Sequence, residues 1–380
     1  MKICAIICEY NPFHNGHLHQ LREAKRLSGA DAVLCIMSGN FVQRGEAAIM
    51  SKFARAKHAV LAGADAVIEL PTIFATSNAE LFAKGAIKIL SSIPSVTTLC
   101  FGAEIADKDA FIHAAKLLNN EPEEISTKIK TLTSTGISYA KARTEAWKDV
   151  LSDELLSSPN NILGIEYTRA ILSFNSQIDI LPIPRIGSGY NEENLHENYS
   201  SASAIRLAIF EKKDIEGNLP DFVQKDLPNT VENNLETLKK YALLSNSTEK
   251  IASICDCSEG LENALKKAAE SSASLTESLT SARYTSSRIR RIALQNLLNI
   301  DEKLIRNGLS NPLYLRILAV KNPAKDLLSS LSESPYPIIA RPRDTNVLSG
   351  CAKEVFTIDE FAEKVYGLLY KQEKNIDIFV

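Results

Sequence analysis

The most constraining feature of this chain is the alternation of strand-sized apolar runs with helix-like segments in its first half. Five runs have the length and composition of buried strands: ICAIIC, AVLCIM, DAVIEL, TTLCF and IDILPI. After the first of them, Leu18, Leu21, Ala24 and Leu27 recur at helical spacing. Apolar strands that alternate with helices are typical of a parallel sheet covered on both faces. We therefore expect an α/β fold with a doubly wound parallel sheet.

The pattern changes near residue 212, after which the chain reads as helices separated by short polar connections. The stretches NNLETLKKYALL, SSRIRRIALQNLLN and LYLRILAV are interpreted as helices, and TIDEFAEKVYGLLYKQE is helix-like near the C-terminal end. The segment EGNLPDF, at residues 216–222, combines Gly, Asn and Pro and marks the change. We expect an α/β domain at residues 1–215 and a mainly helical domain at residues 216–380.

Charge and hydropathy exclude several classes of partner. The formal net charge of -3 predicts no overall attraction to nucleic acid or to an anionic membrane, so such a partner needs a local patch. The longest apolar runs are strand-sized, and the first residues lack the features of a secretion signal. We expect a cytoplasmic protein with no membrane partner and no obligate protein partner.

The cysteines indicate a reduced protein. Cys4, Cys8, Cys35 and Cys100 all lie inside apolar strand-like runs, where buried thiols are common. A C-x-C pair follows at residues 255 and 257 with no second Cys or His cluster nearby, which disfavours a zinc site. We expect no disulfide framework and no metal ligand set in the protein.

The stretch EYNPFHNGHLHQL, directly after the first apolar run, carries the strongest chemical signal. Asn11 and Pro12 begin a turn, and Gly16 allows a ligand to approach the backbone closely. His17 then falls in the first turn of a helix, where unpaired N–H groups attract anions. His14 and His17 are thus predicted to bind phosphate. The alternatives are turn residues without a ligand, or a metal site, for which a carboxylate at helical spacing is absent.

A second signal lies in YSSASAIRLAI, where serines precede a helix that carries an arginine. The hydroxyls of Ser200, Ser201 and Ser203 can cap the helix start, and Arg206 can hold a leaving phosphate group. Serine-rich helix starts are common on their own. Together with HNGH, and in this order, the segment resembles the two signatures of the H-x-G-H nucleotidyltransferase superfamily.

The resemblance narrows when further segments are added. EYNPFHNGH, MSGNFVQRGE, GADAVIELP, FGAE, PNNILGIEY and SASAIR together resemble the bacterial tRNA(Met) cytidine acetate ligases, and the likeness covers nearly the whole chain. The resemblance implies that ATP activates acetate as acetyl-adenylate, with Mg²⁺ on the phosphates. It implies that the acetyl group then passes to the N4 amine of the wobble cytidine in elongator tRNA(Met).

The resemblance also implies site residues. It makes His14, His17 and Arg206 catalytic, and Ser200, Ser201 and Ser203 ATP-binding. It adds the following residues to the ATP site: Ile7, Cys8, Glu9, Tyr10, Asn11, Pro12, Phe13, His14, Asn15, Gly16, His17, Leu18, His19, Gln20, Gly102, Asn160 and Arg185. Without the resemblance, Gly102 fits a turn after a strand, Asn160 a helix cap and Arg185 a solvated arginine.

Two basic clusters are candidate binding surfaces. The segment SARYTSSRIRRIALQ suits RNA phosphates and an exposed base, through Arg283, Tyr284, Arg288, Arg290 and Arg291. Its alternative is a solvated basic helix stripe. The residues 43–46 (QRGE), with Lys52 and Arg55 on the next helix, could bind substrate or phosphate, or form an ordinary charged face.

Two other functions share these motifs. A cofactor-precursor adenylyltransferase would carry the same two signatures, but the additional helical region and its basic segment would then have no evident purpose. A non-catalytic RNA-binding protein could retain a nucleotide-binding fold, but it would not need both His14 and His17.

Overall fold

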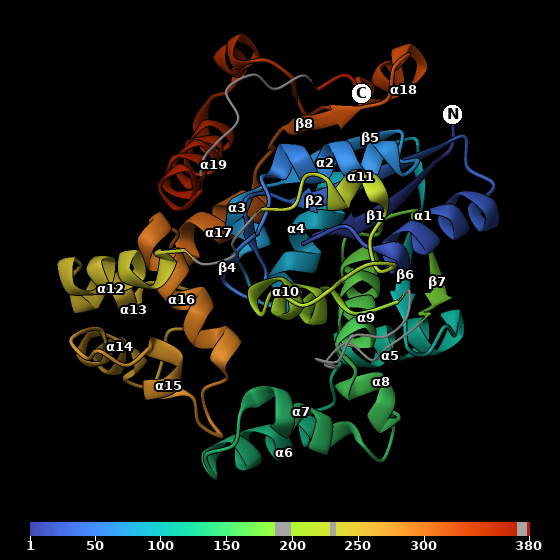
Figure 1. The fold of residues 1–380 in the computed structure, drawn as a ribbon. Helices are drawn as coiled ribbons and strands as arrows, with labels where there is room; N and C mark the ends of the chain where they lie inside the picture. The colour runs from blue at the N-terminus through green and yellow to red at the C-terminus, as the bar shows by residue number, and fades with distance from the viewer. Residues whose placement is uncertain (187–198, 229–232, 371–377) are drawn as a thin grey trace.

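The computed structural model describes residues 1–186, 199–228, 233–370 and 378–380. Its centre is a seven-stranded sheet in the order β7-β6-β1-β2-β5-β8-β9 (Figure 1). The five expected strands are all present and pair in parallel, as predicted. They are β1 (Ile3–Cys8), β2 (Ala32–Ser38), β5 (Ala66–Leu70), β6 (Val96–Ala103) and β7 (Asp179–Pro184).

Helices cover both faces of the sheet because successive strand residues point to opposite sides. Cys4 and Ile6 pack with Leu21 and Ala24 in one apolar cluster, which also includes residues of α2, α10 and α11. The alternate strand residues pack in a second cluster with α3, α4, α5, α9, α17 and α19. The helices of the first face are α1 (Asn15–Ser28), α2 (Lys52–Leu61), α10 (Ala202–Phe210) and α11 (Asp221–Gln224). Those of the second are α3 (Thr72–Ala75), α4 (Ala79–Ser91), α5 (Lys108–Asn119), α9 (Pro159–Ser173), α17 (Glu302–Ser310) and α19 (Gly350–Leu369).

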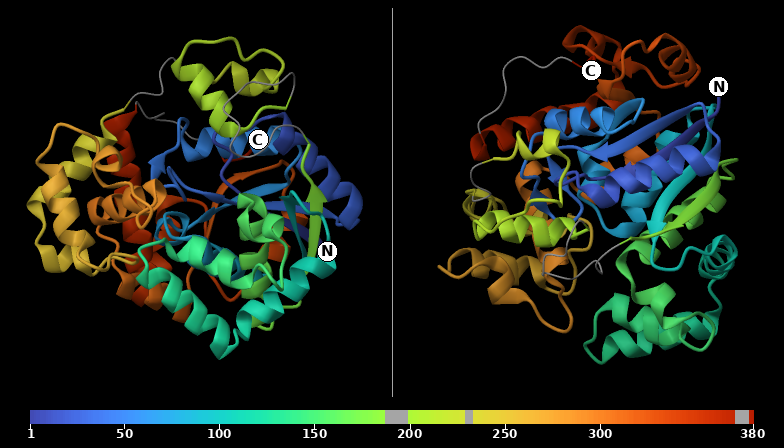
Figure 2. Two further views of the ribbon diagram at one scale, coloured as in Figure 1. Left: turned by 90° about the horizontal axis from the view of Figure 1, so that it is seen from below. Right: turned by 45° about the vertical axis from the view of Figure 1, so that its right-hand side comes forward.

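Two groups of helices lie beside this core, as Figures 1 and 2 both show. The larger group packs around its own apolar cluster, to which Leu243, Leu265 and Ile289 belong. It consists of α12 (Leu235–Ser245), α13 (Thr248–Ala252), α14 (Leu261–Ala269), α15 (Leu275–Leu279) and α16 (Ser286–Leu298). The smaller group consists of α6 (Glu123–Ser134), α7 (Tyr139–Trp147) and α8 (Asp153–Ser157).

The prediction of a helix at LYLRILAV is wrong. Leu315–Val320 form β8, which pairs antiparallel with β5 and so continues the sheet beyond its five parallel strands. β9 (Ile338–Ile339) pairs with β8, and α18 (Lys325–Leu331) and the 3-10 helix Pro342–Val347 lie close by in the chain. A short apolar run fits either a strand or a buried helix. Here the run pairs with the open edge of β5 and therefore forms a strand. The division at residues 215 and 216 stays a prediction, and β8 ties its second part to the sheet of the first.

A short hairpin, β3 (Phe41–Val42) with β4 (Glu46–Ala47), follows β2 and lies over the end of the sheet. The Arg55 guanidinium is fully buried beneath it and donates to the carbonyl oxygens of Met50 (3.0 Å) and Ser38 (3.2 Å). Lys52 is also buried and forms an ion pair with Glu69 at 2.9 Å. The interpretation of Lys52 and Arg55 as an ordinary charged face was wrong, because both side chains are buried. A role for them in binding substrate or phosphate stays a prediction.

Candidate active site

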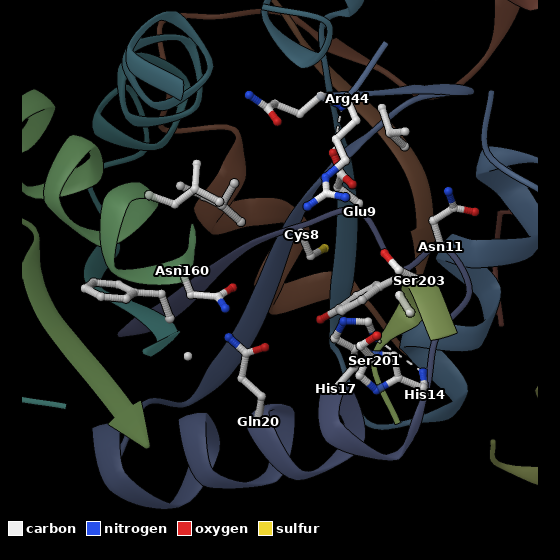
Figure 3. Close-up of a pocket in the computed structure, with 18 of the residues that line it drawn as sticks. Cys8, Glu9, Asn11, His14, His17, Gln20, Arg44, Asn160, Ser201 and Ser203 are labelled. Carbon is white, nitrogen blue, oxygen red and sulfur yellow. Dashed lines mark hydrogen bonds between the residues drawn. The ribbon is translucent and has the colours of Figure 1, made fainter. Parts of the chain in front are cut away.

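One cavity opens at the carboxyl ends of β1 and β6, where ligands bind in doubly wound sheets (Figure 3). Its volume is about 170 Å³. The N-terminal ends of α1 and α10, the β3–β4 hairpin and one face of α9 complete its walls. A second, smaller cavity adjoins it and shares His14, His17 and Arg185 with it. The two are called the central cavity below.

The turn between β1 and α1 places the two histidines against each other. Helix α1 begins at Asn15, and His14 is its N-cap, since the His14 Nδ1 accepts a hydrogen bond from the Gly16 N–H at 3.1 Å. The His17 Nδ1 accepts one from the His14 N–H at 3.3 Å. The rings stack with centroids 3.6 Å apart. A Cβ on Gly16 would lie 2.9 Å from His14 Cε1, so this glycine makes room for the ring itself.

The electrostatics keep both imidazoles neutral. Burial, with Arg185 and Arg206 nearby, lowers the pKa of His14 to about 3. Burial and the neighbouring His14 hold the pKa of His17 well below its usual range. Because both Nδ1 atoms accept hydrogen bonds, the ring proton is on Nε2 in each case. The site therefore has two neutral N–H donors, as an anion-binding turn requires.

The second signature contacts the first directly. Ser201 caps α10, since its Oγ accepts from the Ala204 N–H at 3.1 Å. The Arg206 guanidinium donates to the Asn11 carbonyl oxygen at 2.7 Å and to Ser203 Oγ at 3.2 Å. Segments that are far apart in the sequence thus meet at one end of the central cavity.

The opposite wall is formed by β6 and α9. Gly102 lies within β6, not after it, and a Cβ there would meet the Arg185 side chain at 3.4 Å. Asn160 is not the helix cap: Ser158 occupies the N-cap position of α9, and the Asn160 amide donates to Glu104 Oε1 at 2.6 Å. The capping interpretation of Asn160 was therefore wrong, and its side chain lines the cavity instead.

The cavity brings together most of the predicted ATP-site residues. Four lie behind it: Pro12 and Phe13 are buried, Leu18 packs against the core, and the Asn15 amide donates to the Gly217 carbonyl at 2.7 Å. The remaining predicted residues line the central cavity: Ile7, Cys8, Glu9, Tyr10, Asn11, His14, Gly16, His17, His19, Gln20, Gly102, Asn160, Arg185, Ser200, Ser201, Ser203 and Arg206.

Sequence reasoning missed several apolar and aromatic lining residues. Phe82, Phe101, Leu163 and Tyr167 all line the cavity. A usable signal existed for two of them, since Asn160, Leu163 and Tyr167 follow one another at helical spacing on a single face of α9. Phe82, from α4, carries no such signal.

The β3–β4 hairpin supplies the third wall, with Gln43, Arg44 and Glu46. The Gln43 N–H donates to Glu9 Oε1 at 2.8 Å, which joins the hairpin to the end of β1. Gly45 has a φ of +75°, and a Cβ there would lie 2.6 Å from backbone atoms of Arg290 and Arg291 on α16. The hairpin therefore lies between the central cavity and the helix with the predicted RNA-binding segment.

The arginines of that segment lie close together but have acidic neighbours. Arg283 pairs with Glu259 at 2.8 Å, and Arg291 lies 3.9 Å from Asp256. Arg288 and Arg291 share a face of α16, as predicted, and line a groove with Arg143 of α7, while acidic side chains also line it. The acidic residues of this groove are Glu80, Glu166, Asp256 and Glu259.

Arg290 is directed differently, toward the active-site hairpin. Its Nε donates to the Arg44 carbonyl oxygen at 3.3 Å and lies 3.4 Å from Glu46. Tyr284 lies beneath two guanidinium groups, those of Arg288 and Arg283, at 5.2 and 5.9 Å from its ring centroid. The segment thus presents an arginine–aromatic cluster and, through Arg290, direct contacts with the active-site wall.

In the described part of the chain, no three His, Cys, Asp or Glu side chains are grouped so that they could hold a metal ion. None of the helices described there is long and apolar enough to cross a membrane.

Comparisons with known proteins agree with this geometry. The HIGH Nucleotidyl Transferase family model matches residues 1–378. The tRNA(Met) cytidine acetate ligase of Thermoanaerobacter sp. (strain X514) is 39% identical over 387 residues, covering 98% of this chain and 96% of that protein. The protein of the same name from Acetivibrio thermocellus is 37% identical over 401 residues, with coverage of 98% and 96%.

Two crystal structures of Thermotoga maritima TmcAL are similar along the whole chain. The apo form I matches with a TM-score of 0.89 at 29% identity, over 97% of this chain and 95% of that one. Form II, bound with alpha-thio ATP, matches with a TM-score of 0.86 at 30% identity, over 97% and 94%. The resemblance inferred from the two signatures is thus confirmed: the chain belongs to the HIGH nucleotidyltransferase family, among the tRNA(Met) cytidine acetate ligases.

Proposed function

We propose that this chain uses ATP to activate acetate as acetyl-adenylate and then acetylates the N4 amine of the wobble cytidine in elongator tRNA(Met). The observation that carries the proposal is the contact between the two signatures, in which Arg206 donates to the Asn11 carbonyl beside the paired histidines. The names of the relatives and the alpha-thio ATP bound by a similar structure support it.

Activation of acetate requires positioning and charge neutralisation more than covalent help. An acetate oxygen attacks the α-phosphorus of ATP, and pyrophosphate leaves from the opposite side. The Nε2–H groups of His14 and His17 would donate to the phosphoryl oxygens as their charge increases. Arg206, with the hydroxyls of Ser201 and Ser203, would hold the departing pyrophosphate.

The wall formed by β6 and α9 suits the adenosine part of ATP. Gly102 offers close approach, and Asn160 and Tyr167 offer a polar group and a ring beside it. Arg185, at the end of β7, faces the same cavity from the phosphate side. The other predicted ATP-site residues that line the cavity complete the contact, while the four behind it shape the turn.

Mg²⁺ would be held mainly by the phosphates of ATP. Hard oxygen ligands suit this ion, and the serine hydroxyls near Arg206 are of that type. The described residues contain no cluster of acidic and histidine side chains that would form a separate protein site. The ion would supply charge neutralisation on the phosphates.

RNA binding would use Arg283, Tyr284, Arg288, Arg290 and Arg291. Arg290 contacts the hairpin that walls the cavity, so an anticodon loop held there would lie next to the acetyl-adenylate. Where an arginine already pairs with a carboxylate, as Arg283 does with Glu259, an RNA phosphate would have to replace or share that partner. The substrate tRNA and the free cysteines favour a cytoplasmic location.

The experiment that tests this function follows labelled acetate into RNA. The protein, ATP and labelled acetate are incubated with elongator tRNA(Met), or with the same tRNA carrying uridine at the wobble position. The proposal predicts label in the first RNA, absent without ATP and absent from the uridine variant. Equal labelling of both RNAs, or none in either, would contradict it.

A further inference from the structure

Acetyl transfer to cytosine needs a group that removes a proton. The lone pair of the N4 amine is delocalised into the ring, so the amine is a weak nucleophile and acquires positive charge as it attacks. A positioned base that accepts this proton contributes about 10²–10⁴-fold in rate. The candidates for that base are the side chains that line the central cavity.

The histidines do not fit this role. The Nδ1 atoms of His14 and His17 both accept hydrogen bonds from backbone N–H groups, so each ring has its proton on Nε2. They are donors and have no lone pair left for a proton from the amine. Cys8 and Tyr10 are also unsuitable, because burial keeps the pKa of each well above its usual range.

Among the described residues, two carboxylates line the cavity, those of Glu9 and Glu46. Glu46 belongs to the rim and lies 3.4 Å from the Arg290 guanidinium. Glu9 lies at the end of β1, between the hairpin and the phosphate end of the cavity (Figure 3). Its carbonyl oxygen accepts from Arg55, and its Oε1 accepts from the Gln43 N–H at 2.8 Å. No other hydrogen bond to its carboxylate is formed by the described residues, which leaves Oε2 for a substrate.

Building on the proposed function, we propose that the Glu9 carboxylate is the general base of the acetyl-transfer step. The N4 amine attacks the acetyl carbonyl carbon of acetyl-adenylate, and a carbon–nitrogen bond forms. The bond between that carbon and the phosphate oxygen breaks, and AMP leaves with the electron pair. One proton of the amine passes to Glu9 Oε2 and then to solvent, which completes the balance.

The location of Glu9 agrees with the route of each substrate. In-line displacement requires acetate to lie opposite the leaving pyrophosphate. The proposal puts the acetyl group beside the hairpin, and Glu9 lies between the hairpin residue Arg44 and Ser203 (Figure 3). The cytidine enters past the same hairpin, whose Arg44 carbonyl contacts Arg290 of the RNA segment. Glu9 is therefore where the acetyl group and the amine would meet.

The charges around Glu9 allow a carboxylate to act there. Burial raises the pKa of Glu9 above its usual range, while the Gln43 N–H and the nearby arginines oppose that rise. The charged and titratable groups that face it come from the hairpin, α2, α10 and the end of β1: Arg44, Glu46, Arg55, Arg206, Cys8 and Tyr10. A raised pKa brings the base closer to the working pH, which strengthens it as a proton acceptor.

The test compares Glu9→Gln with the wild-type protein in separate half-reactions. Glutamine keeps an oxygen for the Gln43 N–H but cannot take up a proton. The variant therefore removes the base and leaves the contact with the hairpin in place. Acetate-dependent pyrophosphate exchange reports the first step, and a single-turnover chase of enzyme-bound labelled acetyl-adenylate with tRNA(Met) reports the second. We expect the ratio of transfer to exchange to fall by at least about 100-fold in Glu9→Gln.

The pH dependence gives a second readout. Transfer by the wild-type protein should slow as the pH falls through the raised pKa of Glu9, and Glu9→Gln should lack this limb. Three results would overturn the assignment. They are an equal fall of transfer and exchange in Glu9→Gln, transfer by Glu9→Gln at the wild-type rate, and the same slowing of transfer at low pH in both proteins. Failure of the proposed function gives a different signal: the wild-type protein itself would show no acetate-dependent exchange.

Discussion

The rings of His14 and His17 stack at 3.6 Å between centroids with 25° between their planes, and each ring accepts a backbone hydrogen bond at Nδ1. This arrangement fixes both tautomers before any substrate arrives. Two neutral N–H donors then act where phosphoryl charge increases, with no cost of reorganisation at the moment of reaction.

Replacing His14 with asparagine should separate its two roles. Asparagine is a good N-cap, so His14→Asn should keep the start of α1 while the Nε2 donor is lost. Loss of one such donor predicts a fall of about 10²–10³-fold in acetate-dependent pyrophosphate exchange. The matched control is His113→Asn on the exposed face of α5, which should leave exchange unchanged. Equal exchange in the two variants would exclude His14 from the first step.

The buried His14 should also make stability depend on pH. Its pKa is about 3 in the folded protein, mainly because of burial, against about 6.5 in an unfolded chain. As the pH falls from 6.5 toward 3, the unfolded chain binds a proton that the folded protein does not, so stability decreases. Between pH 7 and pH 5 this amounts to about 2 kcal/mol.

Urea unfolding at those two pH values measures the effect. The wild-type protein should lose about 2 kcal/mol more than His14→Asn when the pH is lowered, because asparagine does not titrate. Identical losses in the two proteins would show that His14 is not held in its neutral form by the fold.

The contact of the hairpin with α16 should depend on Gly45. An alanine there would adopt a left-handed φ, which lowers the free energy of unfolding by about 1–2 kcal/mol. Its Cβ would lie 2.6 Å from backbone atoms of Arg290 and Arg291. The overlap adds about 1–3 kcal/mol. Gly29 has a similar φ of +60° with no atom within 4 Å of the added Cβ, so Gly29→Ala should cost only the first part. Urea unfolding that gives equal costs would contradict the contact.

The ion pair of Lys52 with Glu69 should contribute far more to stability than a surface pair. Both of its side chains are 1% exposed, and Lys52→Met leaves Glu69 with Arg316 as its remaining cation. We expect the free energy of unfolding to fall by about 3 kcal/mol. The control is Lys84→Met, which removes an exposed helical pair with Glu80 and should cost under about 1 kcal/mol. A cost for Lys52→Met as small as the control's would be inconsistent with a buried network.

The sequence predicts the parallel strands and the location of the two signatures because both are local patterns. EYNPFHNGH follows an apolar run directly, so the strand end and the helix start are set within a dozen residues. Strand β8 was missed because its eight-residue apolar run LYLRILAV has no periodicity of its own, and only pairing with β5 makes it a strand.

The sequence predicts some of the cavity-lining residues and not others, for a similar reason. The cavity-facing role of Phe82 depends on how α4 packs, which no spacing in its own segment reveals. Arg283 and Arg291 were recognised as a basic cluster, but their partners Glu259 and Asp256 lie about 25 to 35 residues earlier in the chain. Charge balance in such a groove is a property of the folded protein.

The central claim is that acetate, and not a nucleotide-like acceptor, attacks the α-phosphorus of ATP in the central cavity. Exchange of labelled pyrophosphate into ATP measures this most directly, across a panel of small carboxylates and with and without elongator tRNA(Met). We predict exchange that requires acetate and is lost in His14→Asn. Exchange without any carboxylate, exchange only with a nucleotide-like acceptor, or no exchange even when the tRNA is present would contradict the account.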